Sequence, residues 1–158
     1  MNLKFLLSCL LIVLVSACGS TEETTPPDED EPTPPGGIDV TFTITNRSST
    51  DWIVTDAGGS TVAEENSPDV TWLLELDKRY RIINNAGAAH PLELLGEGDE
   101  RLLAQTGDGT LEADPAIAYE EDDEGITFTM TGDLVERIRA YLCTFHPQMR
   151  GEIVVLSQ

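Results

Sequence analysis

A short C-terminal segment of this chain carries a cysteine, a histidine and a methionine at regular spacing, and the fold must place all three close together. Cys143, His146 and Met149 lie between two apolar segments that are typical of strands. A tight turn between two strand ends would hold a thiolate, an imidazole and a thioether around one point. The chain has only two histidines, and the other, His90, follows a strand and a turn pattern far upstream. We therefore expect the fold to bring these four side chains together as one metal site.

Short alternating segments predict a domain built from β-strands. Residues 40–45 alternate apolar and hydroxyl side chains, which is the period of a half-buried strand, and residues 126–131 repeat this pattern. No segment has a long helical period, and glycine, asparagine and aspartate mark turns between the short segments. We predict an all-β fold, a β-sandwich or barrel of Greek-key or antiparallel type. Further strands are expected at residues 51–55, 78–83, 91–95, 139–143 and 152–156.

The stretch from residue 102 to residue 125 has the weakest pattern. Residues 104–118 fit either one irregular strand or a short helix. Residues 120–124 are consecutive acids, which we interpret as a solvated loop. Calcium binding is the alternative for this run, although the ligand spacing of an EF-hand is absent.

The N-terminus predicts export and lipidation. Lys4 precedes a short apolar run, and residues 1–17 are typical of a signal peptide. Residues 15–18, Val-Ser-Ala-Cys, resemble the lipobox of bacterial lipoproteins, which implies that Cys18 becomes the lipidated first residue of the mature chain. An ordinary signal peptide with an incidental cysteine is the alternative. Lipidation at Cys18 would anchor the protein to a membrane of the cell envelope, on a periplasmic or extracellular face.

A linker and one domain follow the predicted cleavage point. Residues 18–37 comprise the lipidated cysteine and a stretch rich in proline, threonine and acids, which cannot bury enough apolar surface to fold. Residues 38–158 have the length of one ordinary domain. Cys9 lies in the signal peptide, so Cys143 would be the only unmodified thiol of the mature chain, and no intramolecular disulfide is possible.

The charge balance is strongly acidic and excludes one class of partner. The chain has 29 acidic and nine basic side chains, for a formal net charge of −20 at pH 7. Nucleic acid is not expected as a partner, because phosphate binding requires the opposite sign. The acidity either steers a basic redox partner or is halophilic adaptation to a salty habitat. We favour adaptation, because the excess is spread along the chain.

Residues 143–151, Cys-Thr-Phe-His-Pro-Gln-Met-Arg-Gly, resemble the C-terminal ligand loop of the cupredoxins, the type 1 blue-copper proteins. The short spacing is most similar to amicyanin, halocyanin and related plastocyanin-like proteins. The resemblance implies that His90, Cys143 and His146 bind one copper in a plane, with Met149 as a distant axial ligand. Zinc sites rarely include a thioether ligand, whereas copper binds both soft sulfur and imidazole ligands.

Two observations limit the kind of copper protein. Multicopper oxidases carry further histidines after the first ligand, but Glu93 and Leu95 occupy those positions here. A binuclear copper centre would need a second cysteine.

Many small cupredoxins have asparagine directly after the first histidine, where it joins the two ligand loops. Pro91 stands in that position and has no N–H to donate, so Asn84, Asn85 or Thr144 would have to replace that link.

The resulting expectation is a membrane-tethered mononuclear electron-transfer protein that cycles between Cu(I) and Cu(II), without enzymatic activity. Its partner would be a cytochrome, an oxidase or a dehydrogenase, and we expect a monomer. Electrons would pass through the edge of His146, beside an apolar docking patch that includes Phe145, Pro147 and residues 86–89. An envelope lipoprotein that binds or delivers copper is the alternative. We read Asn46 only as part of an Asn-Arg-Ser sequon.

Overall fold

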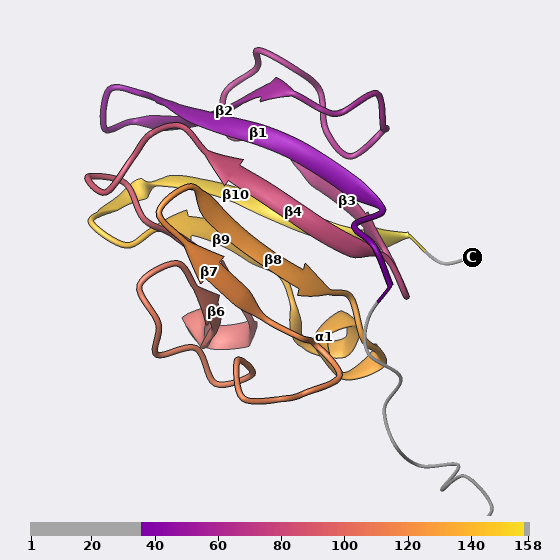
Figure 1. The fold of residues 1–158 in the computed structure, drawn as a ribbon. Helices are drawn as coiled ribbons and strands as arrows, with labels where there is room; N and C mark the ends of the chain where they lie inside the picture. The colour runs from indigo at the N-terminus through magenta and orange to yellow at the C-terminus, as the bar shows by residue number, and fades with distance from the viewer. Residues whose placement is uncertain (1–35, 157–158) are drawn as a thin grey trace, which may run out of the picture. The chain divides into compact units, whose positions relative to one another are not determined.

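In the computed structural model, residues 36–156 are described and form two five-stranded β-sheets (Figure 1). The prediction of an all-β sandwich is confirmed, whereas Greek-key connectivity stays a prediction. The predicted signal peptide, residues 1–17, and the proposed lipidation site, Cys18, lie outside the described residues, as does most of the linker. None of the helices within residues 36–156 is long and apolar enough to cross a membrane.

The first sheet has the strand order β2-β1-β4-β8-β7. β1 runs parallel to β4, and the other pairs are antiparallel. The sequence did not predict this parallel pair. It arises because β4 returns to this sheet after the chain has formed β3 of the other sheet. The bounds are β1 (Val40–Arg47), β2 (Asp51–Asp56), β4 (Arg79–Asn84), β7 (Glu120–Asp122) and β8 (Gly125–Thr129).

The second sheet has the order β3-β10-β9-β5-β6, with β3 parallel to β10 and the remaining pairs antiparallel. Its central strand, β9, lies between β10 and β5 and ends at Cys143. The bounds are β3 (Trp72–Glu75), β5 (Leu92–Leu95), β6 (Arg101–Ala104), β9 (Ala140–Cys143) and β10 (His146–Leu156); the short helices are η1 (Glu97–Asp99) and α1 (Gly132–Arg137).

Every strand expected from the sequence is present, and three further strands, β3, β6 and β7, were not predicted. The interpretation of residues 104–118 was wrong, because β6 ends at Ala104 and turns follow it. The interpretation of residues 120–124 as a solvated loop was also wrong in part. Residues 120–122 form the edge strand β7, whose side chains are all exposed. Its backbone pairs with β8, so a strand forms there without any apolar pattern in its side chains.

Aromatic side chains join the two sheets in the core. On β1 the inward side chains Phe42 and Ile44 are fully buried, as the alternation predicts. Phe42 meets Trp72 of the opposite sheet edge to face, with ring centroids 5.0 Å apart. Trp72 in turn stacks on Tyr141 at 3.7 Å and 7°. Burial of such side chains contributes about 1.5–3 kcal/mol each, so this cluster fixes how the sheets pack behind the end of β9.

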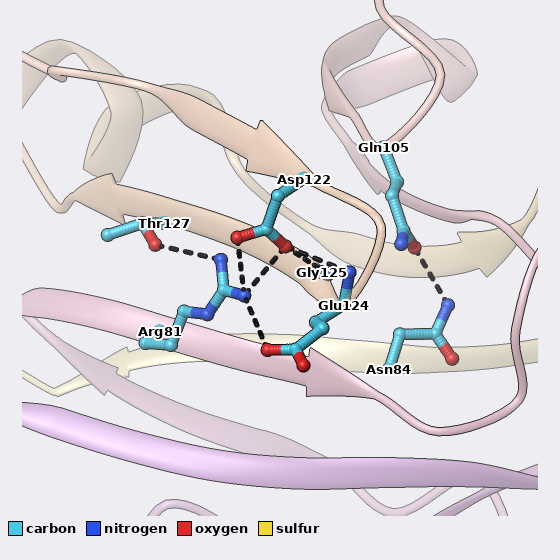
Figure 2. Close-up of polar contacts among 7 residues, drawn as sticks. All are labelled: Arg81, Asn84, Gln105, Asp122, Glu124, Gly125 and Thr127. Atoms are coloured by element: carbon cyan, nitrogen blue, oxygen red, sulfur yellow. Dashed lines mark hydrogen bonds and ion pairs between the residues drawn. The ribbon is translucent and has the colours of Figure 1, made fainter.

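The hairpin of β7 and β8 is held to β4 by an ion pair (Figure 2). Nη2 of Arg81 donates to both carboxylate oxygens of Asp122, at 2.7 and 2.9 Å. Glu124 lies 3.9 Å from the same guanidinium nitrogen. The hydrogen bond from Arg81 is the main cause that lowers the pKa of Asp122 below its usual value. The acidic run is therefore partly neutralised by a basic side chain on the neighbouring strand.

Candidate metal centre

Cys143 and His146 are fixed by the hairpin between β9 and β10. Cys143 is the last residue of β9 and is fully buried, and His146 is the first residue of β10 and lies opposite it in the register. The next registered pair is Arg150 with Leu142, so residues 147–149 bulge out of the strand pairing. A bulge redirects side chains locally. It lets one short hairpin present several donors at the same end of the sheet.

His90 reaches this end of the sheet from the loop between β4 and β5. Its backbone N–H donates to the carbonyl of Gly87 at 2.9 Å, which closes a turn. Its own carbonyl accepts a hydrogen bond from Nδ2 of Asn84 at 2.8 Å. The same Asn84 nitrogen donates to Gln105 at 2.7 Å (Figure 2). The buried Asn84 at the end of β4 thus sets the position of the His90 backbone.

The three side chains converge around one point. Sγ of Cys143 lies 3.7 Å from Nδ1 of His90 and 3.5 Å from Nδ1 of His146. The two imidazole rings are 4.5 Å apart between centroids and are tilted by 30°. One donor atom from each residue lies within 4.8 Å of the other two, so the group could hold one metal ion. The expected approach of His90 to Cys143 across the fold is confirmed.

These separations match the bond lengths of a metal held by sulfur and nitrogen. Bonds of about 2.3 Å to sulfur and 2.0 Å to nitrogen, at an angle between about 110° and 120°, separate the donors by about 3.5 to 3.7 Å. Both sulfur–nitrogen distances fall in that range. A thiolate with two imidazoles suits a soft or borderline transition metal and does not suit calcium or magnesium.

Met149 lies in the bulge and is fully buried, which is unusual for the middle of a surface hairpin. Its side chain belongs to the same buried cluster as Cys143. Burial in the core accounts for its position without any metal, because methionine fills irregular gaps well. Its role as the fourth, axial ligand stays a prediction.

Pro91 and Thr144 supply the link between the two ligand segments. The backbone N–H of Thr144 donates to the carbonyl of Pro91 at 3.0 Å, and the Thr144 hydroxyl lies 3.4 Å from the same oxygen. Leu92 is then paired with Cys143 in the β5–β9 register. Pro91, which has no backbone N–H, therefore takes part in this link through its carbonyl oxygen, as a hydrogen-bond acceptor. Asn84, Asn85 and Thr144 were the candidates from the sequence for this link. Thr144 makes it, and Asn84 donates a hydrogen bond to the carbonyl of His90.

The environment of His90 favours its neutral form. Burial lowers the pKa of His90 below its usual value, and repulsion from His146 adds to the effect. A neutral imidazole is the form that binds a metal. The site is therefore suited to metal binding near neutral pH.

Two residues that the sequence reading did not assign to the site contact the ring of His90. Nδ2 of Asn46 lies 3.2 Å from Nε2 of His90. The edge of Trp52 meets the same ring at 6.4 Å between centroids. Asn46 has the same parity on β1 as the buried Phe42 and Ile44. A side-chain amide on the core face of a strand needs a polar partner. The position of Asn46 on that face was therefore the signal in the sequence that could have assigned it to the site.

One edge of the site lies at the surface. His146 is half-buried, and its neighbour Phe145 is 60% exposed. Ala88 and Ala89, from the loop that carries His90, are also exposed. The site therefore combines a buried sulfur with one imidazole near solvent.

No protein-family model matches this chain, and no curated protein sequence matches it either. The resemblance to cupredoxins therefore rests on the sequence of the ligand loop, and the geometry shows a group that could hold one metal ion.

Proposed function

We propose that this protein is a mononuclear blue-copper electron carrier of the cupredoxin type. Cys143, His90 and His146 would bind the copper, with Met149 as a fourth ligand. The observation that carries the proposal is the pair of sulfur–nitrogen distances, 3.5 and 3.7 Å, between residues far apart in the sequence. Copper would supply the one-electron couple between Cu(I) and Cu(II).

The frame around the donors suits electron transfer. Hydrogen bonds from Thr144 to Pro91 and from Asn84 to His90 fix both ligand segments to strand ends. Cys143 is fully buried, which keeps water away from the sulfur. A site held this firmly has little freedom to rearrange, so it favours a geometry acceptable to both oxidation states. The four proposed ligands leave no position for a substrate, and we propose no enzymatic activity.

His146 is the proposed point of electron exchange. Its ring is half-buried, and exposed Phe145 precedes it in the same hairpin. With Pro147, Ala88 and Ala89, these side chains form the apolar patch that we propose as the docking surface for a redox protein. If the acidity of the chain, with its formal net charge of −20, also steers a partner, it favours one with basic groups near its own redox centre.

Lipidation of Cys18 and a linker over residues 18–37 would tether the domain to an envelope membrane. A Pro-rich linker is a semi-rigid spacer, so the domain would reach a membrane-bound oxidase, dehydrogenase or cytochrome while it stays anchored. We propose a monomer.

A copper-delivery lipoprotein is the second candidate. Delivery requires exchange, and exposed ligands rich in methionine and histidine suit exchange. Burial of Cys143 and His90 favours retention instead, and the chain has only two histidines and three methionines. We therefore rank electron transfer first.

The test is a titration of the purified full-length protein with Cu(II), followed by visible and EPR spectroscopy. We expect one copper per chain, an intense thiolate-to-copper absorption band, and reversible bleaching by a mild reductant. Cys143→Ser should abolish the band. Rapid loss of the copper to a competing chelator in both oxidation states would favour delivery, and the absence of the band would contradict the proposal.

A further inference from the structure

The side-chain amide of Asn46 contacts the His90 ring on the side away from Cys143. Nδ2 of Asn46 lies 3.2 Å from Nε2 of His90, whereas Nδ1 of the same ring faces the sulfur at 3.7 Å. The contact joins strand β1 to the loop before β5. A single imidazole therefore lies between an amide on one side and the proposed metal position on the other.

A second hydrogen bond sets the orientation of the amide. Nδ2 of Asn46 also donates to the carbonyl oxygen of Ser48. The reverse orientation would place the amide oxygen against that carbonyl, so the hydrogen bonds select the orientation with the nitrogen facing both acceptors. Nε2 of His90 then accepts, and the single proton of the neutral ring resides on Nδ1, towards Cys143.

A metal on Nδ1 requires the opposite arrangement. The bound nitrogen cannot carry the ring proton, so that proton moves to Nε2 by exchange with water, and Nε2–H becomes a donor. Ligand histidines almost always donate this second N–H to a carboxylate, a carbonyl or water. Asn46 satisfies it only if the amide turns over and presents its oxygen, which also ends its hydrogen bond to Ser48.

We propose that Asn46 is a positioning residue of the metal centre, and that its amide turns over to accept the Nε2 proton of His90 when a metal occupies Nδ1. This inference rests on the proposed function. Metal binding would then carry a free-energy cost, because the turned amide loses its hydrogen bond to the carbonyl oxygen of Ser48. A carboxylate at position 46 would avoid this cost, since it accepts on both oxygens and has no donor.

Two substitutions with a matched control test the proposal in the full-length protein. Asn46→Leu keeps the size and removes the acceptor, and we expect Cu(I) affinity to fall by about 10- to 100-fold. Asn46→Asp places a carboxylate on Nε2–H, which makes the ligand more basic and should lower the reduction potential. Asn85→Asp adds the same charge at an exposed neighbouring position and should change neither quantity. Wild-type affinity in Asn46→Leu, or equal potentials in the two aspartate variants, would overturn the inference.

The tautomer can be read directly by long-range proton–nitrogen NMR of the histidine rings, and only two rings contribute. Without added metal, we expect Nε2 of His90 to be unprotonated in the wild type and mainly protonated in Asn46→Leu. With Cu(I), Nε2 should carry the proton in the wild type. Identical His90 tautomers in the wild type and Asn46→Leu without metal would overturn the inference. This comparison needs no metal, so it decides the role of Asn46 even if copper fails to bind and the proposed function is wrong.

Discussion

The carbonyl oxygen of Pro91 accepts a hydrogen bond from the backbone N–H of Thr144, so the two ligand segments are joined through main-chain atoms. Pro91, which stands where many small cupredoxins have asparagine, is thus part of the connection. The backbone nitrogen of Thr144 lies 3.0 Å from the Pro91 oxygen, whereas the Thr144 hydroxyl oxygen is farther away, at 3.4 Å. The backbone hydrogen bond is therefore the stronger part of this link.

A change of the Thr144 side chain should therefore have a small effect. In Thr144→Val the backbone hydrogen bond to Pro91 remains, and we expect a loss of stability below about 1 kcal/mol. The copper absorption band should keep its position. Chemical denaturation and visible spectroscopy measure both quantities. A Thr144→Val variant that no longer binds copper would show that the hydroxyl, and not the backbone, holds the loops together.

Gly151 leaves room for the Tyr141 ring, and alanine there should destabilise the protein. A Cβ at position 151 would lie 2.2 Å from the ring and hydroxyl of Tyr141. The ring cannot move easily, because it is stacked on Trp72 and its hydroxyl donates to the carbonyl of Val70. We expect Gly151→Ala to cost about 1–3 kcal/mol of unfolding free energy.

Gly132→Ala is the matched control for that substitution. A Cβ at position 132 meets nothing within 4 Å, and the residue begins α1, where alanine is favoured over glycine. Its unfolding midpoint should equal or slightly exceed that of the wild type. A similar midpoint for both variants would contradict the steric explanation.

The Arg81–Asp122 pair should contribute to stability in a pH-dependent way. The pKa of Asp122 is lowered in the folded protein, chiefly by the hydrogen bond from Arg81. The contribution is therefore complete above the ordinary carboxyl value of 3.8 and is lost as the pH falls through the lowered pKa. Asp122→Asn should lower the stability at pH 7 by less than about 1 kcal/mol, because the Asp122 carboxylate is exposed to solvent.

Asp123→Asn provides the comparison, since Asp123 makes no hydrogen bond or ion pair among residues 36–156 and carries the same charge. Denaturation at pH 7 and at pH 3 measures the difference between the two variants. The difference should shrink at the lower pH. A difference that is larger at pH 3 than at pH 7 would contradict the assigned sign.

The apolar patch around His146 should control electron exchange without affecting the metal. We expect Phe145→Lys and Ala88→Lys to slow exchange with a redox partner about tenfold or more, since a buried charge at a contact is costly. Val154→Lys changes an exposed apolar residue in the far half of β10 and serves as the control. Stopped-flow kinetics measures the rates. Equal rates in all three variants would rule out this docking surface.

The sequence was sufficient to predict the strands with alternating side chains and the convergence of His90 with Cys143 and His146. The strands rest on a local pattern, the period of residues such as Phe42 and Ile44. The convergence rests on the close spacing of Cys143 and His146 in one turn and, for His90, on the resemblance to the cupredoxin ligand set, because His90 is 53 residues away from Cys143 in the sequence. The parallel pairing of β1 with β4 could not be predicted, because alternation defines a face of a strand and not its neighbour.

Other elements had no readable pattern for physical reasons. β7 consists of exposed acids, and its pairing with β8 uses only backbone groups. α1 has six residues, which is too short for a helical period, although Thr131 accepts the capping hydrogen bond from Leu134. Asn46 was read only as a sequon, because its contact with His90 depends on the packing of β1 beside a loop 44 residues away.

X-ray absorption at the copper edge of the copper-loaded protein identifies the atoms bound to the metal. We expect one short copper–sulfur bond and two copper–nitrogen bonds of imidazole type, with the short sulfur bond lost in Cys143→Ser. A copper environment of oxygen and nitrogen alone in the wild-type protein would contradict the assignment of Cys143, His90 and His146 as a metal centre.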